Sequence, residues 1–257
     1  MDWSRTKTIF IFTFFLLNVF LTWQLVETHN VNQISMITEA TIQEVLRENN
    51  VQIEVDLPEE ESPGLLVVGK YIEIQTTDVP LDDNQKIELL DDYTILSQLI
   101  EPFALSRENF ATELSTFLTS HVFKGETYRF GGFDSEKNRV TLYQMYGEKT
   151  AYTLEEEPLI LQLDEDLQIV GYQQRHFQFE EQEGEEREIL SSLKAIEVLL
   201  NDQLIRMNQT ITNVQFGYYS FFSPTGDVQV FAPMWRVTVD GETYLVHAIG
   251  GSVQQLT

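Results

Sequence analysis

The N-terminal part of the chain combines an uninterrupted apolar run with charges on one side only. Residues 9–26, IFIFTFFLLNVFLTWQLV, contain no charged side chain. At about 1.5 Å rise per residue, some 20 residues cross a hydrocarbon layer of about 30 Å, and a helix satisfies its own backbone groups there. The pattern therefore predicts a transmembrane helix over residues 8–26.

The charges around this run predict its orientation. Arg5 and Lys7 precede the run, and the next basic residue is Arg47. The positive-inside rule therefore places residues 1–7 in the cytoplasm and the remainder outside the cell. The run exceeds the 7–15 residues of a signal-peptide core, and no A-x-A-like cleavage site follows. We expect a single-pass protein of the plasma membrane, retained in the lipid bilayer by this helix.

Two polar residues of the predicted span fall on one helical face. Asn18 lies near the middle and Thr22 follows one turn later. An amide at this depth is costly against lipid and gains by hydrogen bonding across a helix interface. We expect this face to contact a partner's transmembrane helix, although a plain anchor that tolerates Asn18 fits the same pattern. By i, i+3, i+4 spacing the face, called here the helix stripe, consists of Ile11, Phe14, Phe15, Asn18, Leu21, Thr22 and Leu25.

Beyond residue 26 the apolar positions alternate between helical and strand-like spacing. Helical spacing predicts helices over residues 31–50, from residue 106 and after residue 188. The Asp-rich residues 78–92 are expected to be irregular. Apolar residues at every second position predict strands over residues 51–55, 65–75, 124–134, 139–147, 158–164 and 167–179, and in three runs after residue 213.

The predicted elements occur twice in the same order, as strands, one helix and then antiparallel strands. The acidic sequence EEEP at residues 155–158 interrupts the pattern between the two sets. A helix on one face of each sheet would hide its apolar side. We therefore predict an α+β fold of two modules, residues 27–155 and 156–257, with antiparallel sheets packed by helices.

Charge and cysteine content narrow the possible functions. The chain has 41 acidic and 16 basic residues, a net charge of -25. Such a surface repels nucleic acid phosphates and anionic lipid headgroups, so we expect no nucleic-acid partner. It suits a cationic partner or divalent ions, or simply a solvated exterior. The absence of cysteine excludes thiolate nucleophiles, cysteine-ligated zinc and disulfides.

A search for metal ligands gives no site. The four histidines, His29, His121, His176 and His247, are far apart in sequence, and no H-E-x-x-H occurs. Acidic pairs such as Asp164 and Asp166 lack the EF-hand pattern and suit a turn between strands. We expect no metal and no cofactor.

One short motif matches a catalytic pattern. Residues 191–194, Ser-Ser-Leu-Lys, fit the S-x-x-K of penicillin-binding enzymes. The partner motifs S-D-N and K-T-G do not follow it, and no G-x-S-x-G or phosphate-binding glycine loop occurs. We expect no catalytic residue and no enzymatic activity.

Two stretches carry a resemblance to a known family. The opening has Asp-Trp-Ser, a Lys-Thr entry to the apolar run and a Leu-Asn-Val-Phe-Leu core, and residues 232–253 read APMWRVTVDGETYLVHAIGGSV. Both resemble the YycI (WalI) family of Gram-positive bacteria. The second stretch departs from that family at His247-Ala248, where Asn-Ala is expected. Together they cover less than a quarter of the chain.

The resemblance implies a role that composition does not. Such proteins are accessory regulators of the YycG (WalK) sensor histidine kinase, which controls cell-wall metabolism, and act with a YycH-like protein. Their membrane helix is thought to assemble with the helices of the kinase and to restrain its signalling, and their fold is two α+β modules outside the membrane. One alternative is an extracytoplasmic binding module with the helix as a tether. A second is a cell-wall hydrolase or transpeptidase, supported only by S-x-x-K.

Overall fold

The computed structural model describes residue 7 and residues 10–22, 41–59, 64–80, 83–153, 157–182 and 187–256. The described strands join in one 14-stranded sheet, which confirms the predicted α+β class. Neighbouring strands are antiparallel, except that β1 (Gln52–Ile53) and β7 (Lys149–Tyr152) run parallel to β11 (Thr210–Thr225). The sheet is therefore mixed at these two places.

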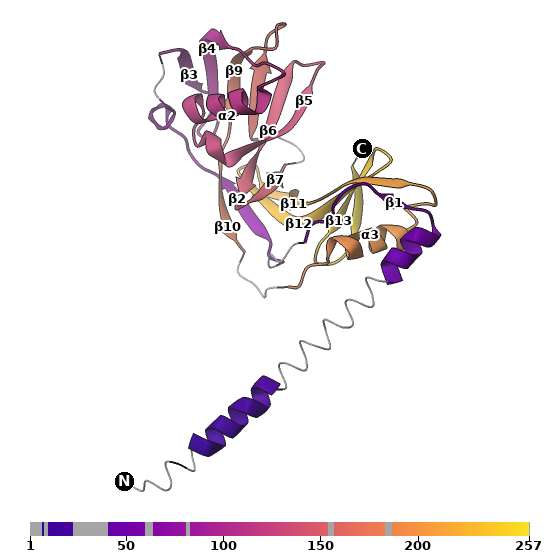
Figure 1. The fold of residues 1–257 in the computed structure, drawn as a ribbon. Helices are drawn as coiled ribbons and strands as arrows, with labels where there is room; N and C mark the ends of the chain where they lie inside the picture. The colour runs from indigo at the N-terminus through magenta and orange to yellow at the C-terminus, as the bar shows by residue number, and fades with distance from the viewer. Residues whose placement is uncertain are drawn as a thin grey trace.

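Figure 1 shows that this sheet extends through two lobes, each covered by a helix. The α2 lobe contains α2 (Phe110–His121), η1 (Thr76–Asp78), β3 (Gln85–Leu89), β4 (Ile95–Phe103), η2 (Gly125–Thr127), β5 (Tyr128–Asp134), β6 (Arg139–Tyr146), β8 (Leu159–Leu163) and β9 (Ile169–Gln174). The α3 lobe contains α3 (Ser192–Asn201), β1, β2 (Val67–Tyr71), β7, β10 (Phe177–Glu181), β11, β12 (Val228–Val239), β13 (Glu242–His247) and β14 (Val253–Leu256). The helical residues 41–48 join the α3 lobe, because Ile42 and Leu46 lie in its core.

Helix α2 forms in the region where a helix is predicted from residue 106, and its apolar residues face the core. Leu114, Phe117 and Leu118 are buried, and Phe110 packs half-buried beside them. The helix begins at Phe110, four residues later than predicted. The preceding segment is tied to the first turn of the helix, because Ser106 donates hydrogen bonds from its backbone N and its Oγ to the carboxylate of Glu113.

Helix α3 covers the apolar face of the C-terminal strands. The helix predicted after residue 188 forms from Ser192, and its Leu193, Ile196 and Leu199 are buried in the core of the α3 lobe. Trp235 of β12 lies in the same core with no exposed surface, and its Nε1 donates to the carbonyl oxygen of Leu190 at 2.7 Å. This hydrogen bond joins the sheet to the segment that leads into α3.

Other sequence predictions are met in part. The strands predicted over residues 124–134 and 139–147 pair as a hairpin with Asp134 opposite Arg139 at its turn, but Gly125–Thr127 form η2 and β5 begins at Tyr128. The expectation that residues 78–92 are irregular is wrong for β3, which pairs with β4 at one end of the sheet. Residues 41–48 of the helix predicted over 31–50 are helical, and residues 31–40 lie outside the described part of the chain.

Each hydrophobic core contains residues from both sides of the predicted module boundary at residue 155. Strands β8 and β9 follow residue 155, yet their Leu159, Leu161 and Ile169 share a core with Phe117 of α2. Conversely, β2 and β7 precede the boundary and pack in the α3 lobe. The chain therefore passes between the lobes more than once. The division into residues 27–155 and 156–257 stays a prediction.

Candidate functional site

The helix stripe is described for six of its seven residues. Residues 10–22 are helical, and Leu25 lies outside the described part of the chain. The apolar members of the described stripe are exposed, from 50% for Leu21 to 71% for Ile11. Contacts within this chain therefore leave the apolar surface of the stripe uncovered.

The two polar residues of the stripe differ in what they can offer a neighbouring helix. Asn18 Nδ2 donates to the carbonyl oxygen of Phe14 at 2.8 Å, and Thr22 Oγ1 donates to the carbonyl oxygen of Asn18 at 2.8 Å. A carboxamide has two N–H donors and an acceptor oxygen, whereas a hydroxyl has one donor. Asn18 therefore keeps donor and acceptor capacity for an intermolecular bond, while the Thr22 donor is already used. The sequence alone did not separate these roles.

The predicted span of residues 8–26 is only partly described. Residues 8, 9 and 23–26 lie outside the described part of the chain. In the part that the structure describes, no helix is both long and apolar enough to cross a membrane. The transmembrane assignment therefore stays a prediction.

A buried polar network lies where the two lobes meet, and no pattern in the sequence predicts it. Gln144 of β6 binds the backbone of Phe177, the first residue of β10, in both directions. The Phe177 N donates to Gln144 Oε1 at 2.7 Å, and Gln144 Nε2 donates to the Phe177 carbonyl oxygen at 2.8 Å. This pair of bonds fixes the α2 lobe to the strand that continues into the α3 lobe.

His176 sits inside the same network, with 4% of its surface exposed. Its Nδ1 lies 3.0 Å from Tyr128 Oη, and its Nε2 lies 3.4 Å from Gln144 Nε2. Tyr128 donates its own proton to the Arg175 carbonyl oxygen at 2.7 Å, so Nδ1 must be the protonated nitrogen and Nε2 the acceptor. Burial lowers the pKa of His176 from 6.5 to about 4, with a smaller effect from the charge of Lys124.

Neighbouring residues extend this junction network. Gln174 Nε2 donates to the carbonyl oxygen of Phe123 at 2.7 Å and to Tyr128 Oη at 3.1 Å. Arg175 Nε donates to Thr94 Oγ1 at 2.8 Å. These bonds tie the end of β9 to the residue before Lys124, to the start of β5 and to the residue that precedes β4, so the network positions strands.

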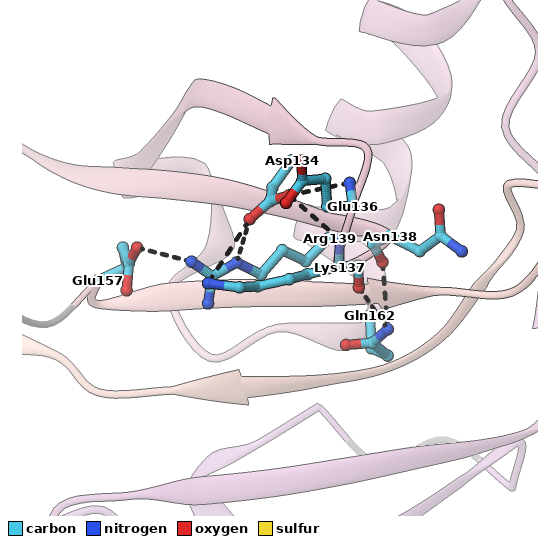
Figure 2. A network of polar contacts seen from close by, with 7 residues as sticks. All are labelled: Asp134, Glu136, Lys137, Asn138, Arg139, Glu157 and Gln162. Atoms are coloured by element: carbon cyan, nitrogen blue, oxygen red, sulfur yellow. Dashed lines mark hydrogen bonds and ion pairs between the residues drawn. The ribbon is translucent and has the colours of Figure 1, made fainter.

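Figure 2 shows a second polar network at the turn between β5 and β6. Asp134 Oδ1 accepts hydrogen bonds from the backbone N of Glu136 at 3.0 Å and of Lys137 at 3.1 Å, which lowers the pKa of Asp134. Arg139 Nε lies 3.4 Å from Asp134 Oδ2, and Arg139 Nη2 lies 3.5 Å from Glu157 Oε1. The Nε contact lacks hydrogen-bond geometry, so it is electrostatic. The network stabilises the hairpin turn.

The described histidines are not brought together. His121 stacks on Phe117, and His176 belongs to the junction network. His247 Nδ1 accepts hydrogen bonds from the backbone N of Ile249 and Gly250 and so closes the turn after β13. Within the described ranges, no group of three or more His, Asp or Glu side chains could hold a metal ion. The absence of a metal or cofactor stays a prediction.

The S-x-x-K motif has a structural role at the start of α3. Ser191 Oγ accepts a hydrogen bond from the backbone N of Lys194 at 3.3 Å, the arrangement of an N-cap. Ser192, the next residue, is buried. Ser191 thus satisfies one of the free N–H groups at the helix N-terminus.

Comparison with known proteins identifies one family and several solved structures. The model of a family described as YycI protein matches residues 29–249. A crystal structure of an uncharacterized protein from Eubacterium rectale has a TM-score of 0.42 and 10% identity, covering 80% of this chain and 86% of that one. The crystal structure of YycH from Bacillus subtilis has a TM-score of 0.38 and 11% identity, covering 74% of this chain and 56% of that one. A comparison with curated proteins found no match.

Proposed function

The chain belongs to the YycI family of regulatory accessory proteins, and from this membership we propose that it modulates the YycG (WalK) sensor histidine kinase without catalysis. The single observation that carries the proposal is the family match over residues 29–249. In this role the protein is held in the plasma membrane by residues 8–26, with its N-terminus in the cytoplasm. A YycH-like protein acts with it outside the membrane.

The proposed mechanism is a shift in the packing of the kinase helices. A helix that binds one packing more tightly than another moves the equilibrium by the difference in its two affinities. A coupling free energy of about 1–3 kcal/mol changes output about 5- to 150-fold. One interhelical hydrogen bond contributes roughly 0.6–2 kcal/mol. A bond from Asn18 together with packing of the stripe is therefore large enough to restrain signalling.

The unequal hydrogen-bond capacity of the stripe supports a test on Asn18. We expect Asn18→Leu to lower co-purification with the kinase and to raise kinase-dependent reporter output, because the interhelical bond is lost. Thr22→Leu should have the smaller effect, since the Thr22 hydroxyl proton is already bonded within the helix.

A control with the same amino-acid composition distinguishes the effect of the position of Asn18 from the effect of a more apolar helix. The double variant Asn18→Leu/Leu16→Asn leaves the composition of the helix unchanged but moves the asparagine to the opposite face by helical spacing. This double variant should behave like Asn18→Leu. Wild-type output and co-purification in both variants would refute the role of the stripe.

Replacing residues 8–26 with an unrelated membrane span distinguishes a regulator that acts through its helix from an extracytoplasmic module on a tether. Loss of regulation, with correct localisation retained, supports action through the helix. Full regulation with the foreign helix supports the tether.

A further inference from the structure

The α2 lobe carries an apolar groove at the end where three segments meet. These are the segment leading into α2, the β5–β6 hairpin and the turn between β8 and β9. The groove has a volume of about 380 Å³, within the range of sites that accept ligand groups or side chains. Its walls include Leu105, Phe110, Phe130, Phe133, Leu163 and Leu167.

Three of these apolar side chains remain open to solvent. Phe130 is 50% exposed, Phe133 47% and Leu167 36%. Phe130 meets Phe110 edge to face, with ring centroids 5.5 Å apart, which places its ring at the wall of the groove. Exposed aromatic and aliphatic side chains gathered at one groove, with a polar rim, are typical of protein interaction sites.

The backbone at Leu167 points to a role for its side chain. Leu167 has a φ of +60°, in the left-handed region that glycine and asparagine adopt at lower cost. The turn itself is held by Asp164, whose Oδ1 accepts from the backbone N of Asp166 and Gln168. A leucine at position 167 therefore does not stabilise the turn. We attribute its presence to the apolar surface that its side chain adds to the groove.

The charge around the groove selects among possible occupants. Residues 105–113, 130–140 and 163–167 contain seven carboxylates and three basic side chains. Two of the basic side chains, Lys137 and Arg139, already pair with Asp134, as Figure 2 shows for this hairpin. The surroundings are therefore anionic. A second copy of this chain, with a net charge of -25, would be repelled.

We propose that this groove binds an apolar segment flanked by lysine or arginine, contributed by another protein outside the membrane. The apolar side chains of that segment fill the groove, and its basic residues face the acidic rim. The inference rests on the proposed function in one respect, that the protein works through contacts with other proteins. It adds a contact on the α2 lobe, whereas residues 41–48 pack in the α3 lobe (Figure 1).

In-cell crosslinking tests the groove directly. A photoreactive amino acid is placed at Phe133 of the full chain, and at Ile11 of the helix stripe in a parallel experiment. Crosslinks from Phe133 should map by mass spectrometry to an apolar segment with basic flanking residues. Crosslinks to a second copy, to lipid, or to an acidic or uncharged segment would overturn the proposal. So would no crosslink from Phe133 when Ile11 still crosslinks, a result that leaves the proposed function intact.

Matched substitutions show whether the contact depends on apolar surface. Leu167→Asn should lower the crosslinking yield from Phe133 about fivefold or more, as expected for a lost apolar contact. Its thermal stability should be equal or higher, because asparagine suits the left-handed backbone. The control is Leu90→Asn, at an exposed leucine elsewhere in the same lobe, which should change neither. Equal yields in both variants would contradict the assignment.

A charge reversal tests the chemistry of the partner. Asp166→Lys should weaken crosslinking from Phe133, since it opposes a basic flank. Glu48→Lys makes the same change on the exposed surface of helical residues 41–48 and should leave the yield unchanged. An unchanged or increased yield with Asp166→Lys would overturn the basic-flank assignment.

Discussion

Acidification should destabilise the protein through one buried histidine. His176 is neutral in the folded chain, because its Nε2 accepts from Gln144 while its Nδ1 proton goes to Tyr128. A proton on Nε2 would face the Gln144 amide N–H. Flipping that amide would remove both of its bonds to the Phe177 backbone, at 2.7 and 2.8 Å. Protonation of His176 is therefore opposed by the geometry of the junction between the lobes.

The size of the effect follows from the pKa of His176. Burial lowers it from 6.5 to about 4, so the unfolded chain binds this proton more readily than the folded chain does. The stability contributed by the neutral side chain is complete above the unfolded pKa and is lost as the pH falls through the folded pKa. The difference corresponds to about 3 kcal/mol of unfolding free energy.

The measurement compares wild type with His176→Gln, using chemical denaturation of the full chain in detergent between pH 7.5 and pH 4. Because the 41 carboxylates also titrate in acid, only the difference between the two proteins isolates His176. At pH 7.5 the variant should be less stable by about 1–3 kcal/mol, the cost of buried groups that lose hydrogen-bond partners. Toward pH 4 wild type should lose about 3 kcal/mol relative to the variant, so its advantage should vanish or reverse.

Two results would refute this reasoning. One is a wild-type advantage that does not change with pH. The other is an NMR titration in which His176 of the folded protein has a pKa near 6.5, which would mean that burial does not disfavour its charged form.

Three further substitutions have defined expected outcomes, each measured by denaturation of the full chain. Trp235→Phe should lower the free energy of unfolding by about 1–3 kcal/mol, since the Leu190 carbonyl oxygen loses its donor. An unchanged free energy of unfolding would mean that water replaces the indole N–H as the donor. Ser191→Ala should cost about 0.5–2 kcal/mol through the lost helix cap, with reporter output unchanged; a stable protein that lost activity would instead support a catalytic serine. Gly125→Ala should be severely destabilising, because a Cβ there would lie 1.8 Å from the Leu118 carbonyl oxygen; near-wild-type stability would show that η2 can shift.

The periodicity of apolar residues predicted those elements whose pattern is complete within one short stretch of sequence. Helix α3 repeats apolar residues over three turns, and the β5–β6 hairpin has clear alternation on both sides of a polar turn, so both were found. Strand β3 was missed because its five residues include only Ile87 and Leu89 as apolar positions, next to an Asp-rich stretch, and it pairs on one side only. A short strand at the sheet end carries little signal of its own.

The junction network could not be predicted for a different reason. Gln144 and His176 are 32 residues apart, and in sequence each is an ordinary polar residue, the first within a predicted strand and the second near the end of one. Their roles arise only when β6 and the segment between β9 and β10 are adjacent in space. The helix stripe shows the opposite case, since its seven positions follow from spacing, whereas the difference between Asn18 and Thr22 required hydrogen-bond geometry.

The continuity of the sheet across both lobes has a mechanical consequence. Strand β6 pairs with β8 in one lobe and with β7 toward the other, and β7 continues the ladder to β11. The two lobes can therefore slide or separate along this path only by breaking the backbone hydrogen bonds of β6 with β7 or of β7 with β11. Because residues 41–48 pack in the core of the α3 lobe, a force on the α2 lobe is transmitted to them through this continuous ladder.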